Sequence, residues 1–315
     1  MEYTIVVDDN KFYAYKRYKF YRKFIYEIAS KNYDLYYFDL NDYPYFFLIL
    51  SGCINLNKII VAAHNVVTPR GARYYYIARI YMHYVLKVYK NFHVFSESQK
   101  VELLKKNPNS NVLYAPLCLK DYGISKQVKQ NTPIVFLFFG NIVKYKRLDL
   151  LINAALILEK RYHREFIIRI CGYCPPKEWD RTYKKLIGNS KVFQLDLRRI
   201  PNGEVADLFE TSHYFIMPYQ DIAQSGAMTV AFNYNLPIIA SNIISFQQFI
   251  EDGLTGYLFE KGSTISLAEK MGYAIEHHDM YCSMQRSQRQ FIDNNLSTKL
   301  IIKKYNVYLT KLLNA

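Results

Sequence analysis

Short runs of β-branched and other apolar residues alternate along the chain with longer segments in which apolar residues recur every three or four positions. The first pattern predicts strands and the second predicts helices. Their regular alternation is typical of stacked βα units, which form a parallel sheet covered by helices. The predicted strands cover residues 3–7, 34–39, 58–63, 93–96 and 111–115, and then 134–139, 166–171, 191–195, 214–218, 237–241 and 256–259.

A polar stretch at residues 125–132 separates the two groups of strands. We therefore predict two open α/β domains, over residues 1–127 and 128–315, and a chain of 315 residues is long enough for both. In such sheets, ligands bind beyond the carboxyl ends of the strands, and a cleft between two domains is a common place for an active site. We expect the chemistry in the loops that follow the strands.

Two predicted helices, at residues 11–29 and 72–90, are both amphipathic and basic. Such helices commonly cover a sheet, but basic helices rich in tyrosine also suit contact with anionic lipid headgroups. Both interpretations stay open. The predicted apolar faces are Ala14, Tyr18, Tyr21, Ile25 and Ile28 in the first helix, and Ile77, Ile80, Tyr84 and Val88 in the second.

Composition narrows the candidate functions without choosing one. The net charge of +14 fits a nucleic acid, an anionic membrane surface or a phosphorylated ligand as a partner. The five cysteines are scattered, no secretory signal pattern opens the chain, and no apolar run reaches the ~20 residues of a membrane-spanning helix. We therefore expect a cytoplasmic protein that does not cross a membrane and that has at most a peripheral place at the membrane's inner face.

A strand, a glycine and a basic loop follow one another ahead of a predicted helix at residues 134–155. Gly140 allows a close backbone approach, and the helix start offers unpaired N–H groups to an anion. Lys144, Lys146 and Arg147 add positive charge that suits a diphosphate. Basic residues are common at the start of surface helices, so this segment alone is weak support for a phosphate site.

A second segment of this kind begins where the strand at residues 214–218 ends. A polar loop leads to Gln224, Ser225 and Gly226, where another helix is predicted to start. The Ser225 hydroxyl suits an N-cap, and the helix start again presents unpaired N–H groups. Two helix starts of this type in one domain favour a phosphorylated ligand.

These segments resemble, in order and spacing, the donor-binding half of glycosyltransferase family 4. The resemblance runs through FFGNI at 138–142, NGEVADLF at 202–209, QSG at 224–226, LPIIAS at 236–241 and EDGLTG at 251–256. It implies a GT-B fold, with two Rossmann-like domains whose parallel sheets face one another across a cleft. It also implies a hexosyltransferase that is retaining and independent of metal. The implied donor is a UDP- or GDP-linked sugar with no further cofactor, the acceptor a glycan or a lipid-linked molecule, and the setting bacterial surface polysaccharide biosynthesis.

Several site residues can be carried over by position. Lys146 corresponds to the lysine that holds the donor diphosphate in this family, in the loop that begins at Gly140. Asn141 stands where an arginine is frequent, so Lys144 or Arg147 would have to supply the missing charge. We expect Lys146 to be catalytic, because it would stabilise the negative charge that develops on the leaving diphosphate.

The resemblance also assigns the second loop and the base pocket. Gln224, Ser225 and Gly226 correspond to the loop whose backbone N–H groups hold phosphates or sugar hydroxyls. The pocket for the nucleotide base should lie near Arg199 and Ile200, before the predicted helix that begins at about residue 202.

One departure concerns a pair of glutamates, eight positions apart, that many members use on the sugar and the ribose. The corresponding residues here are Ala223 and Ala231. A subgroup that carries Pro-Tyr followed by Gln-Ser-Gly departs in the same way, so the absence does not exclude activity. Asp221 is a candidate substitute, although a solvated loop aspartate is the more common situation.

His64 follows the predicted strand at 58–63, at a position where the family commonly places a histidine that faces the donor sugar. At the carboxyl end of a strand it could hydrogen-bond a hydroxyl or the leaving oxygen, so we expect it to be catalytic. The alternative is a histidine bonded to a neighbouring carbonyl. The remaining histidines are expected to be structural: His83, His93, His163, His213, His277 and His278.

Three other functions compete with catalysis of sugar transfer. The missing glutamates and a first domain that is short for the family fit a non-catalytic GT-B-like subunit or a truncated relative. The positive charge fits a nucleic-acid-binding protein, but no recognisable reading module is present, so nucleic acid is not an expected partner. Cys171 and Cys174 form a C-x-x-C redox pattern, yet Gly172 between them coincides with a family glycine, and no second cysteine pair supports zinc.

Overall fold

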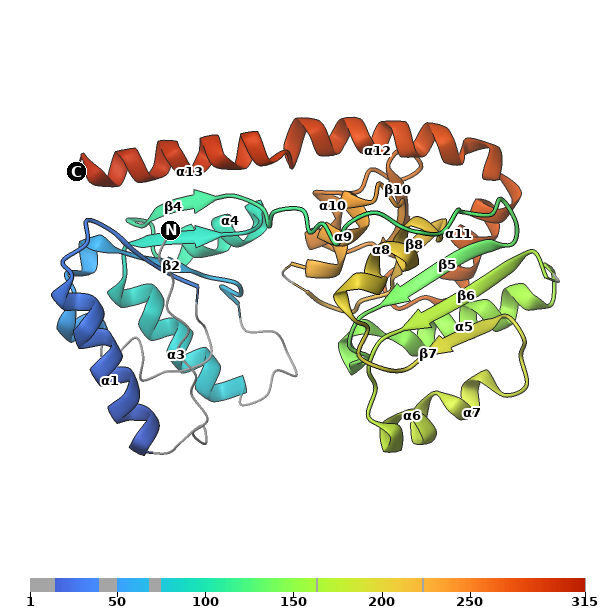
Figure 1. Ribbon diagram of the computed structural model, residues 1–315, viewed down its shortest axis with the longest axis horizontal. Helices are drawn as coiled ribbons and strands as arrows, with labels where there is room; N and C mark the ends of the chain where they lie inside the picture. The colour runs from blue at the N-terminus through green and yellow to red at the C-terminus, as the bar shows by residue number, and fades with distance from the viewer. Residues whose placement is uncertain (1–14, 40–49, 68–74, 163, 223, 315) are drawn as a thin grey trace. The chain divides into compact units, whose positions relative to one another are not determined.

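The computed structural model describes residues 15–39, 50–67, 75–162, 164–222 and 224–314, with the backbone alone for residues 15–17. The chain divides into two compact units (Figure 1). The first unit comprises Met1–Pro116 and Ile301–Ala315, and the second comprises Leu117–Leu300. Each holds a parallel sheet with helices, which confirms the predicted α/β class. The strand predicted at residues 3–7 lies outside the described residues.

The first unit has a sheet with strand order β1-β2-β3-β4, and all its neighbouring strands are parallel. Its strands are β1 (Tyr36–Phe38), β2 (Ile59–Ala62), β3 (Asn91–Val94) and β4 (Asn111–Tyr114). β3 begins two residues earlier than predicted because the polar Asn91 is buried and its side chain donates a hydrogen bond to Asn57 O at 2.8 Å. Ser96, predicted as the end of that strand, instead caps α4 (Glu97–Lys106).

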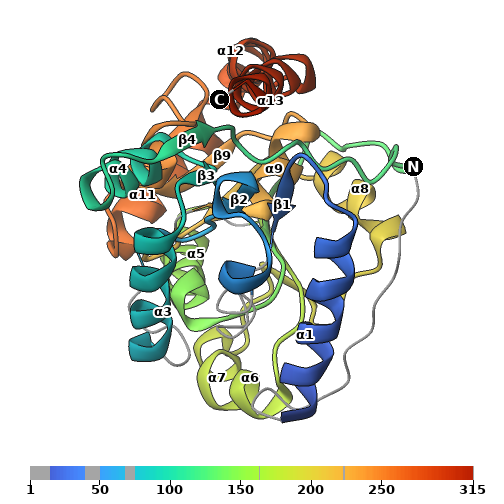
Figure 2. The same ribbon diagram turned by 90° about the vertical axis from the view of Figure 1, so that its left-hand side faces the viewer.

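Helices α1 (Tyr15–Ser30) and α3 (Tyr75–Val88) confirm the two predicted amphipathic helices and flank the sheet of the first unit (Figure 2). In α1 the predicted face is correct, because Ile25 is fully buried and Tyr21 and Ile28 pack beside it. This helix therefore covers the sheet.

The predicted apolar face of α3 is half correct, because Tyr84 and Val88 pack against the core of the first unit but Ile77 and Ile80 do not. Tyr81, Val85 and Leu86 are buried, whereas Ile80 is 72% exposed and Ile77 is also exposed. The helix is apolar around most of its circumference, so periodicity offered more than one stripe, and contact with the sheet selected the stripe that contains Tyr81. The stripe with Ile77 and Ile80 faces away from the core.

The last helix, α13 (Thr298–Leu313), joins the first unit from Ile301 onward, although the predicted second domain extends to residue 315. Ile301 and Tyr308 pack against Ile60 of β2, and the Tyr308 hydroxyl donates to Asn111 O at 2.9 Å. Neighbours of Ile60 along β2 point to the opposite face, where the larger cluster of this unit lies. An amphipathic helix does not reveal in its sequence which sheet it will cover.

The compact units also part at residue 116, earlier than the predicted boundary at 127. Tyr122 N–H donates to the Tyr234 hydroxyl at 2.9 Å, and the Ser125 hydroxyl donates to Asp207 at 2.7 Å. The polar stretch that looks like a linker is thus attached to the second unit by hydrogen bonds.

The second unit has a sheet with strand order β10-β9-β8-β5-β6-β7, again with parallel neighbours throughout. All its predicted strands are confirmed within two residues at each end. They are β5 (Ile134–Phe139), β6 (Phe166–Cys171), β7 (Phe193–Asp196), β8 (Tyr214–Met217), β9 (Ile238–Ser241) and β10 (Gly256–Phe259).

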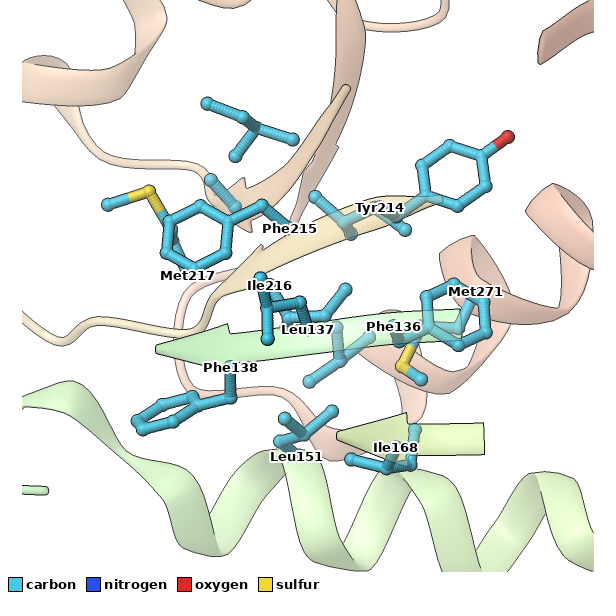
Figure 3. Packing of buried hydrophobic residues seen from close by; sticks show 14 of the residues in the cluster. Phe136, Leu137, Phe138, Leu151, Ile168, Tyr214, Phe215, Ile216, Met217 and Met271 are labelled. Carbon is cyan, nitrogen blue, oxygen red and sulfur yellow. The ribbon is translucent and has the colours of Figure 1, made fainter. Parts of the chain in front are cut away.

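The core of the second unit is built on β5 and β8, whose residues are almost all buried (Figure 3). Phe136 and Phe138 alternate with Leu137 along β5, so the strand supplies apolar side chains to both faces of the sheet. The helices of this unit are α5 (Leu148–Glu159), α6 (Pro176–Thr182), α7 (Lys184–Ile187), α8 (Asn202–Glu210), α9 (Gly226–Asn233), α10 (Ile244–Gln247), α11 (Thr264–Glu276) and α12 (Tyr281–Asn295).

Candidate active site

The loops that follow β5 and β8 meet at the middle of the second unit's sheet. From β5 the chain continues outward through β6 to β7, and from β8 it continues in the other direction through β9 to β10. The strand order therefore reverses between β5 and β8, which are hydrogen-bonded neighbours. Ligands of open α/β sheets bind at the carboxyl ends of the strands at such a switch point. Gln220 N–H donates to Tyr145 O at 2.8 Å and joins the two loops directly.

Two glycines bring the ends of β5 and β6 into very close contact. A Cβ on Gly172 would lie 2.0 Å from the carbonyl oxygen of Gly140, and Gly172 has a φ of +147°. Gly140 has a φ of +98°, and its N–H donates to Cys171 O at 2.9 Å. No side chain fits at Gly172, so this glycine determines where the loop after β5 starts.

Lys146 ends the short 3₁₀ helix η2 (Lys144–Lys146) in that loop, and only 8% of it is exposed. Its Nζ donates to Phe139 O at 3.4 Å and lies 5.5 Å from the centre of the Tyr219 ring. Among the described residues, no carboxylate forms an ion pair with it. Burial lowers the pKa of this ammonium to about 8, so it stays charged at neutral pH.

A buried cation with one long hydrogen bond and two aromatic rings as neighbours is poorly compensated. Transfer of a charge out of water is unfavourable unless the charge is paired and hydrogen-bonded. An anion bound at Lys146 would supply the missing partner. Titratable groups with a pKa that is shifted by burial occur often at functional sites.

The loop after β8 connects that strand to α9 and passes Lys146 at Tyr219. Tyr219 is fully buried, contacts the Tyr145 ring edge-on with centroids 5.8 Å apart, and hydrogen-bonds the side chain of Ser225. Ser225 is the N-cap of α9, as predicted, and its hydroxyl accepts from Met228 N–H at 3.4 Å. The first turn of α9 contains no acidic residue, so its positive end is not neutralised from within the helix.

The other basic residues of the β5 loop differ in their suitability. Arg147 has a left-handed φ of +50° and donates three hydrogen bonds to Asp149, from Nε at 2.9 and 3.1 Å and from Nη2 at 2.7 Å. Its charge is thus already paired, which weakens the expectation that it binds a diphosphate. Lys144 and Asn141 are exposed in the same loop, where Lys144 is the stronger candidate.

The remaining predicted residues of the second unit lie on two different loops. Arg199 is exposed and Ile200 is half-buried, and both follow β7, the edge strand that is two strands away from β5. The neighbouring Arg198 is ion-paired with Asp196 and Glu204. Gln224 is half-buried immediately before the cap of α9. The roles of these residues stay predictions.

Lys120 is a residue that the sequence analysis did not single out. Its Nζ lies 3.4 Å from the position that a Cβ on Gly226 would take, at the first residue of α9. Lys120 precedes the polar stretch and stands on no predicted strand, turn or motif, so no signal in the sequence points to it. Only the packing of this segment along α9 brings its charge to the site.

The glutamate pair is replaced by residues that cannot do the same chemistry. Ala231 is fully buried in α9 and belongs to the core of the second unit. Ala223 lies outside the described residues. Asp221 is exposed, as expected for a solvated loop aspartate.

In the first unit, His64 follows β2 and Asp39 follows the neighbouring strand β1, so both lie at the carboxyl edge of the sheet. His64 Nε2 pairs with the Asp39 carboxylate, and the His64 ring stacks on Phe95 with centroids 4.5 Å apart. A carboxylate partner fixes the orientation of the imidazole. The His64 side chain is partly exposed and the Asp39 side chain is exposed, so a ligand can reach the pair.

His93 lies beside this pair and is structural, as expected. It is fully buried, its Nε2 hydrogen-bonds Ala115 O at 2.9 Å, and its Nδ1 lies 2.6 Å from the Tyr37 hydroxyl. Burial lowers the pKa of His93 to about 4, so the ring is neutral at pH 7.

The C-x-x-C segment is structural in the second unit. Cys171 and Cys174 are both buried and free. Burial raises the pKa of Cys171 to about 12 and also raises the pKa of Cys174. A buried thiol with a raised pKa is a poor nucleophile, which agrees with the interpretation of Gly172 as the functional part of this motif.

The described residues offer neither a metal centre nor a membrane span. No group of three or more His, Cys, Asp and Glu side chains in this part of the chain is arranged to hold a metal ion. Within the same residues, every helix is too short or too polar to span a bilayer.

Two units with parallel sheets of this topology define the GT-B class of α/β protein, and comparison of the sequence specifies the family. The chain belongs to the family described as glycosyl transferases group 1, whose sequence model matches residues 123–292. An uncharacterised glycosyltransferase of Methanocaldococcus jannaschii is 22% identical over 204 residues, which are 62% of this chain and 50% of that protein. The chain therefore spans about half the length of this curated relative.

Solved structures of glycosyltransferases share the fold at low identity. A glycosyltransferase from Rickettsia africae superposes with a TM-score of 0.74 at 18% identity. The match covers 98% of this chain and 84% of the Rickettsia chain. S. aureus TarM, solved as a mutant with fondaparinux, alpha-GlcNAc-glycerol and UDP, gives 0.73 at 18% identity, with 92% and 58% covered. The pneumococcal O-GlcNAc transferase GtfA, solved with UDP and GlcNAc, gives 0.75 at 17% identity, with 95% and 61% covered.

Proposed function

We propose that the protein transfers a sugar from a nucleoside-diphosphate sugar to a glycan or a lipid-linked acceptor. The observation that carries this proposal is the buried ammonium of Lys146, which has no carboxylate partner among the described residues. It lies at the switch point next to Tyr219, whose hydroxyl hydrogen-bonds the cap of α9. Membership of the group 1 family and the presence of UDP in the TarM and GtfA structures agree with it.

The chemistry follows from charge. When the bond between the anomeric carbon and the diphosphate breaks, negative charge grows on the leaving oxygen. Lys146 and the N–H groups at the start of α9 are held in place before the reaction, so they stabilise that charge without reorganising. The protein then needs neither a metal nor a cofactor besides the donor for this step, since the cation is a side chain.

His64 is the proposed catalytic residue of the first unit. Its carboxylate partner Asp39 holds the ring in place through Nε2. In this role the imidazole hydrogen-bonds a donor hydroxyl or the leaving oxygen, and Asp39 positions it. The proposed transfer is retaining and of the hexosyl type, as in family 4, with Arg199 and Ile200 at the base of a UDP- or GDP-linked donor.

A peripheral membrane contact fits the proposed acceptor. Tyr76 and Ile80 of α3 are 77% and 72% exposed, and the exposed Arg79 and Lys87 lie on the same helix. Apolar and basic side chains together suit a membrane surface that carries anionic headgroups. We propose on this basis a cytoplasmic enzyme that works at the inner face of a bacterial cell membrane, in surface polysaccharide assembly.

A second candidate function is a non-catalytic subunit that partners an active glycosyltransferase. The observation that favours it is Ala231, which belongs to the core of α9 where many relatives carry a glutamate. Such a subunit could still bind a nucleotide, so binding alone does not separate the two functions. Turnover does.

The deciding experiment has two stages. Isothermal titration with UDP, GDP, UMP and GMP measures whether the purified chain binds a nucleoside diphosphate and which base it prefers. Donor hydrolysis and transfer to membrane extracts, followed by release of UDP or GDP, then measure turnover, and NMR of the product gives its anomeric configuration. Binding with turnover supports the enzyme, binding without turnover supports the subunit, and no binding contradicts both.

A further inference from the structure

The segment that precedes β5 runs along α9 and holds Lys120 at the first turn of that helix. Lys120 N–H lies 3.5 Å from Thr229 O, and two residues later Tyr122 N–H donates to the Tyr234 hydroxyl at 2.9 Å. Leu119 and Tyr122 pack against the core of the second unit. The backbone on both sides of Lys120 is thus attached to the same body as Lys146.

The Lys120 ammonium lies at the start of α9. Its Nζ is 3.4 Å and its Cε is 4.0 Å from the position that a Cβ on Gly226 would take. These distances place the end of the lysine side chain in van der Waals range of the helix start. The end of the helix that it reaches is the one with unpaired N–H groups.

Lys120 is exposed, and its ammonium adds positive charge at the start of α9 that an anion would compensate. The first turn of a helix carries partial positive charge, so a cation there is repelled, and α9 has no acidic residue in that turn. Some lysines of the chain lie beside carboxylates, for example Lys100 with Glu97 and Lys270 with Asp252. Among the described residues, no carboxylate pairs with Lys120.

Lys146 is a second, independent sign of an anion at the same place. It is more than nine-tenths buried, and its ammonium has one protein acceptor for three N–H donors among the described contacts. It is linked to the start of α9 through the Tyr219 ring and the hydrogen bond between the side chains of Tyr219 and Ser225. Lys120 at the helix start and Lys146 in the loop that is linked to it thus come from distant parts of the sequence.

We infer that Lys120 is a second diphosphate-binding residue, which compensates for the uncharged Asn141 in the loop after β5. This inference rests on the proposed function, because the anion in question is the diphosphate of the donor. In this arrangement Lys146 and Lys120 both bind the diphosphate. A nucleoside monophosphate offers fewer charged oxygens, so it needs only one of the two lysines.

The test compares Lys120→Ala with Lys126→Ala in titrations with UDP, GDP, UMP and GMP. Lys126 is exposed in the same segment, so its substitution removes the same charge at a place where no diphosphate is expected. We expect Lys120→Ala to raise the Kd for the preferred diphosphate about tenfold, the lower end for a hydrogen bond to a charged group. The monophosphate Kd should change less than threefold, and Lys120→Arg should restore most of the diphosphate affinity.

The outcomes separate this inference from the proposed function. If the wild-type chain binds diphosphates, Lys146→Ala weakens that binding and Lys120→Ala matches Lys126→Ala, the inference is wrong and the proposed function stands. If Lys120→Ala weakens mono- and diphosphates equally and Lys120→Arg does not rescue, Lys120 has only a structural role, which also overturns the inference. If the wild-type chain binds no nucleoside diphosphate, both are overturned. Lys120→Gln provides a second neutral variant in case the alanine variant lowers the melting temperature.

Discussion

The polar groups at the carboxyl edges of the two sheets differ in whether they have partners within the protein. In the first unit, His64 is paired with Asp39, and His93 is hydrogen-bonded to Ala115 O and close to the Tyr37 hydroxyl. In the second unit, Lys146 is buried without a carboxylate partner among the described residues. The first edge is electrostatically complete, whereas the second is short of negative charge.

Because of this difference, a bound anion should contribute more to the stability of the second unit than to that of the first. A site whose charges are already paired gains little from an added anion, because the anion must replace existing bonds. A buried cation that lacks a partner gains the whole interaction. We therefore expect ligand-linked effects at the second edge and effects on folding alone at His93 in the first.

The largest expected effect comes from removal of the Lys146 charge. Lys146→Met keeps the apolar stem and should lower kcat/KM for transfer about 100- to 1000-fold, the loss typical of one oxyanion-stabilising donor. The same variant should raise the stability of the unliganded protein by an amount on the order of 1–3 kcal/mol, because a poorly compensated charge is no longer buried.

Activity assays and urea unfolding check these opposite signs. Lys160→Met, which changes an exposed lysine at the other end of α5, should alter neither quantity by more than a small factor. A Lys146→Met protein that is less stable and fully active would remove the contrast between the two edges.

The next effect concerns the glycine contact that places the β5 loop. Gly172→Ala should lower the free energy of unfolding by about 2–4 kcal/mol, because its Cβ would meet the Gly140 carbonyl and because its φ of +147° is strained for alanine. Trp179 is the one tryptophan and lies in the second unit, so its fluorescence during urea unfolding reports this loss.

A matched glycine provides the control for that variant. Gly203 lies in α8 with open space around it, and Gly203→Ala should raise stability by ~0.5–1 kcal/mol, the usual gain for alanine in a helix. Equal effects of the two substitutions would mean that the close approach of β5 and β6 is not what the glycine at 172 provides.

In the first unit, pH should act on folding through His93. The folded pKa of His93 is about 4, below the unfolded value near 6.5, so between these values the unfolded chain binds a proton that the folded chain does not. Stability therefore falls as the pH falls through this window, by ~2 kcal/mol at pH 5 from this residue.

Hydrogen exchange of amides in β2 and β3 at pH 7 and pH 5 measures that loss. His93→Gln should reduce it, whereas His83→Gln, at an exposed position, should leave it unchanged. The pKa of His213 in the second unit is also lowered, to about 3, so residual acid sensitivity in His93→Gln is expected there and not in β2. Unchanged acid sensitivity of β2 and β3 in His93→Gln would contradict this account of the first edge.

In the second unit, pH should act on ligand affinity instead. The pKa of Lys146 is about 8 without ligand, and a bound anion raises it. Below pH 8 the ammonium is present and diphosphate affinity is full; above pH 8 the Kd should rise by up to tenfold per pH unit, with uptake of a proton on binding.

Titrations from pH 7 to pH 9.5 in buffers of different ionisation enthalpy measure both quantities. Lys146→Arg keeps its charge throughout this range, so its Kd should be nearly independent of pH. A wild-type Kd that does not change between pH 7 and pH 9.5 would mean that the Lys146 charge does not hold the ligand.

Much of this molecule could be predicted from local patterns. Phe138 to Ile142 show a strand, a glycine turn and a basic loop because each of these structures depends on residues close in sequence, and Ser225 marks its helix start for the same reason. Where the choice depended on a distant partner, the pattern was insufficient. The sequence pattern places Ile77 and Ile80 on the buried face of α3, which is wrong because the sheet that selects the buried stripe is not part of the helix sequence.

The amino-acid sequence by itself determined the alternation of strands and helices, the glycine turns and the cap of α9, because these arise from periodicity, backbone freedom and side-chain hydrogen bonds within a few residues. Tertiary structure alone decided that Lys146 is buried, that Arg147 is neutralised by Asp149, that His64 pairs with Asp39 and that Lys120 reaches Gly226. The physical reason is that desolvation and charge pairing depend on which groups share a volume of space. Residues 106 positions apart in the sequence, such as Lys120 and Gly226, come to share that space only when the chain folds.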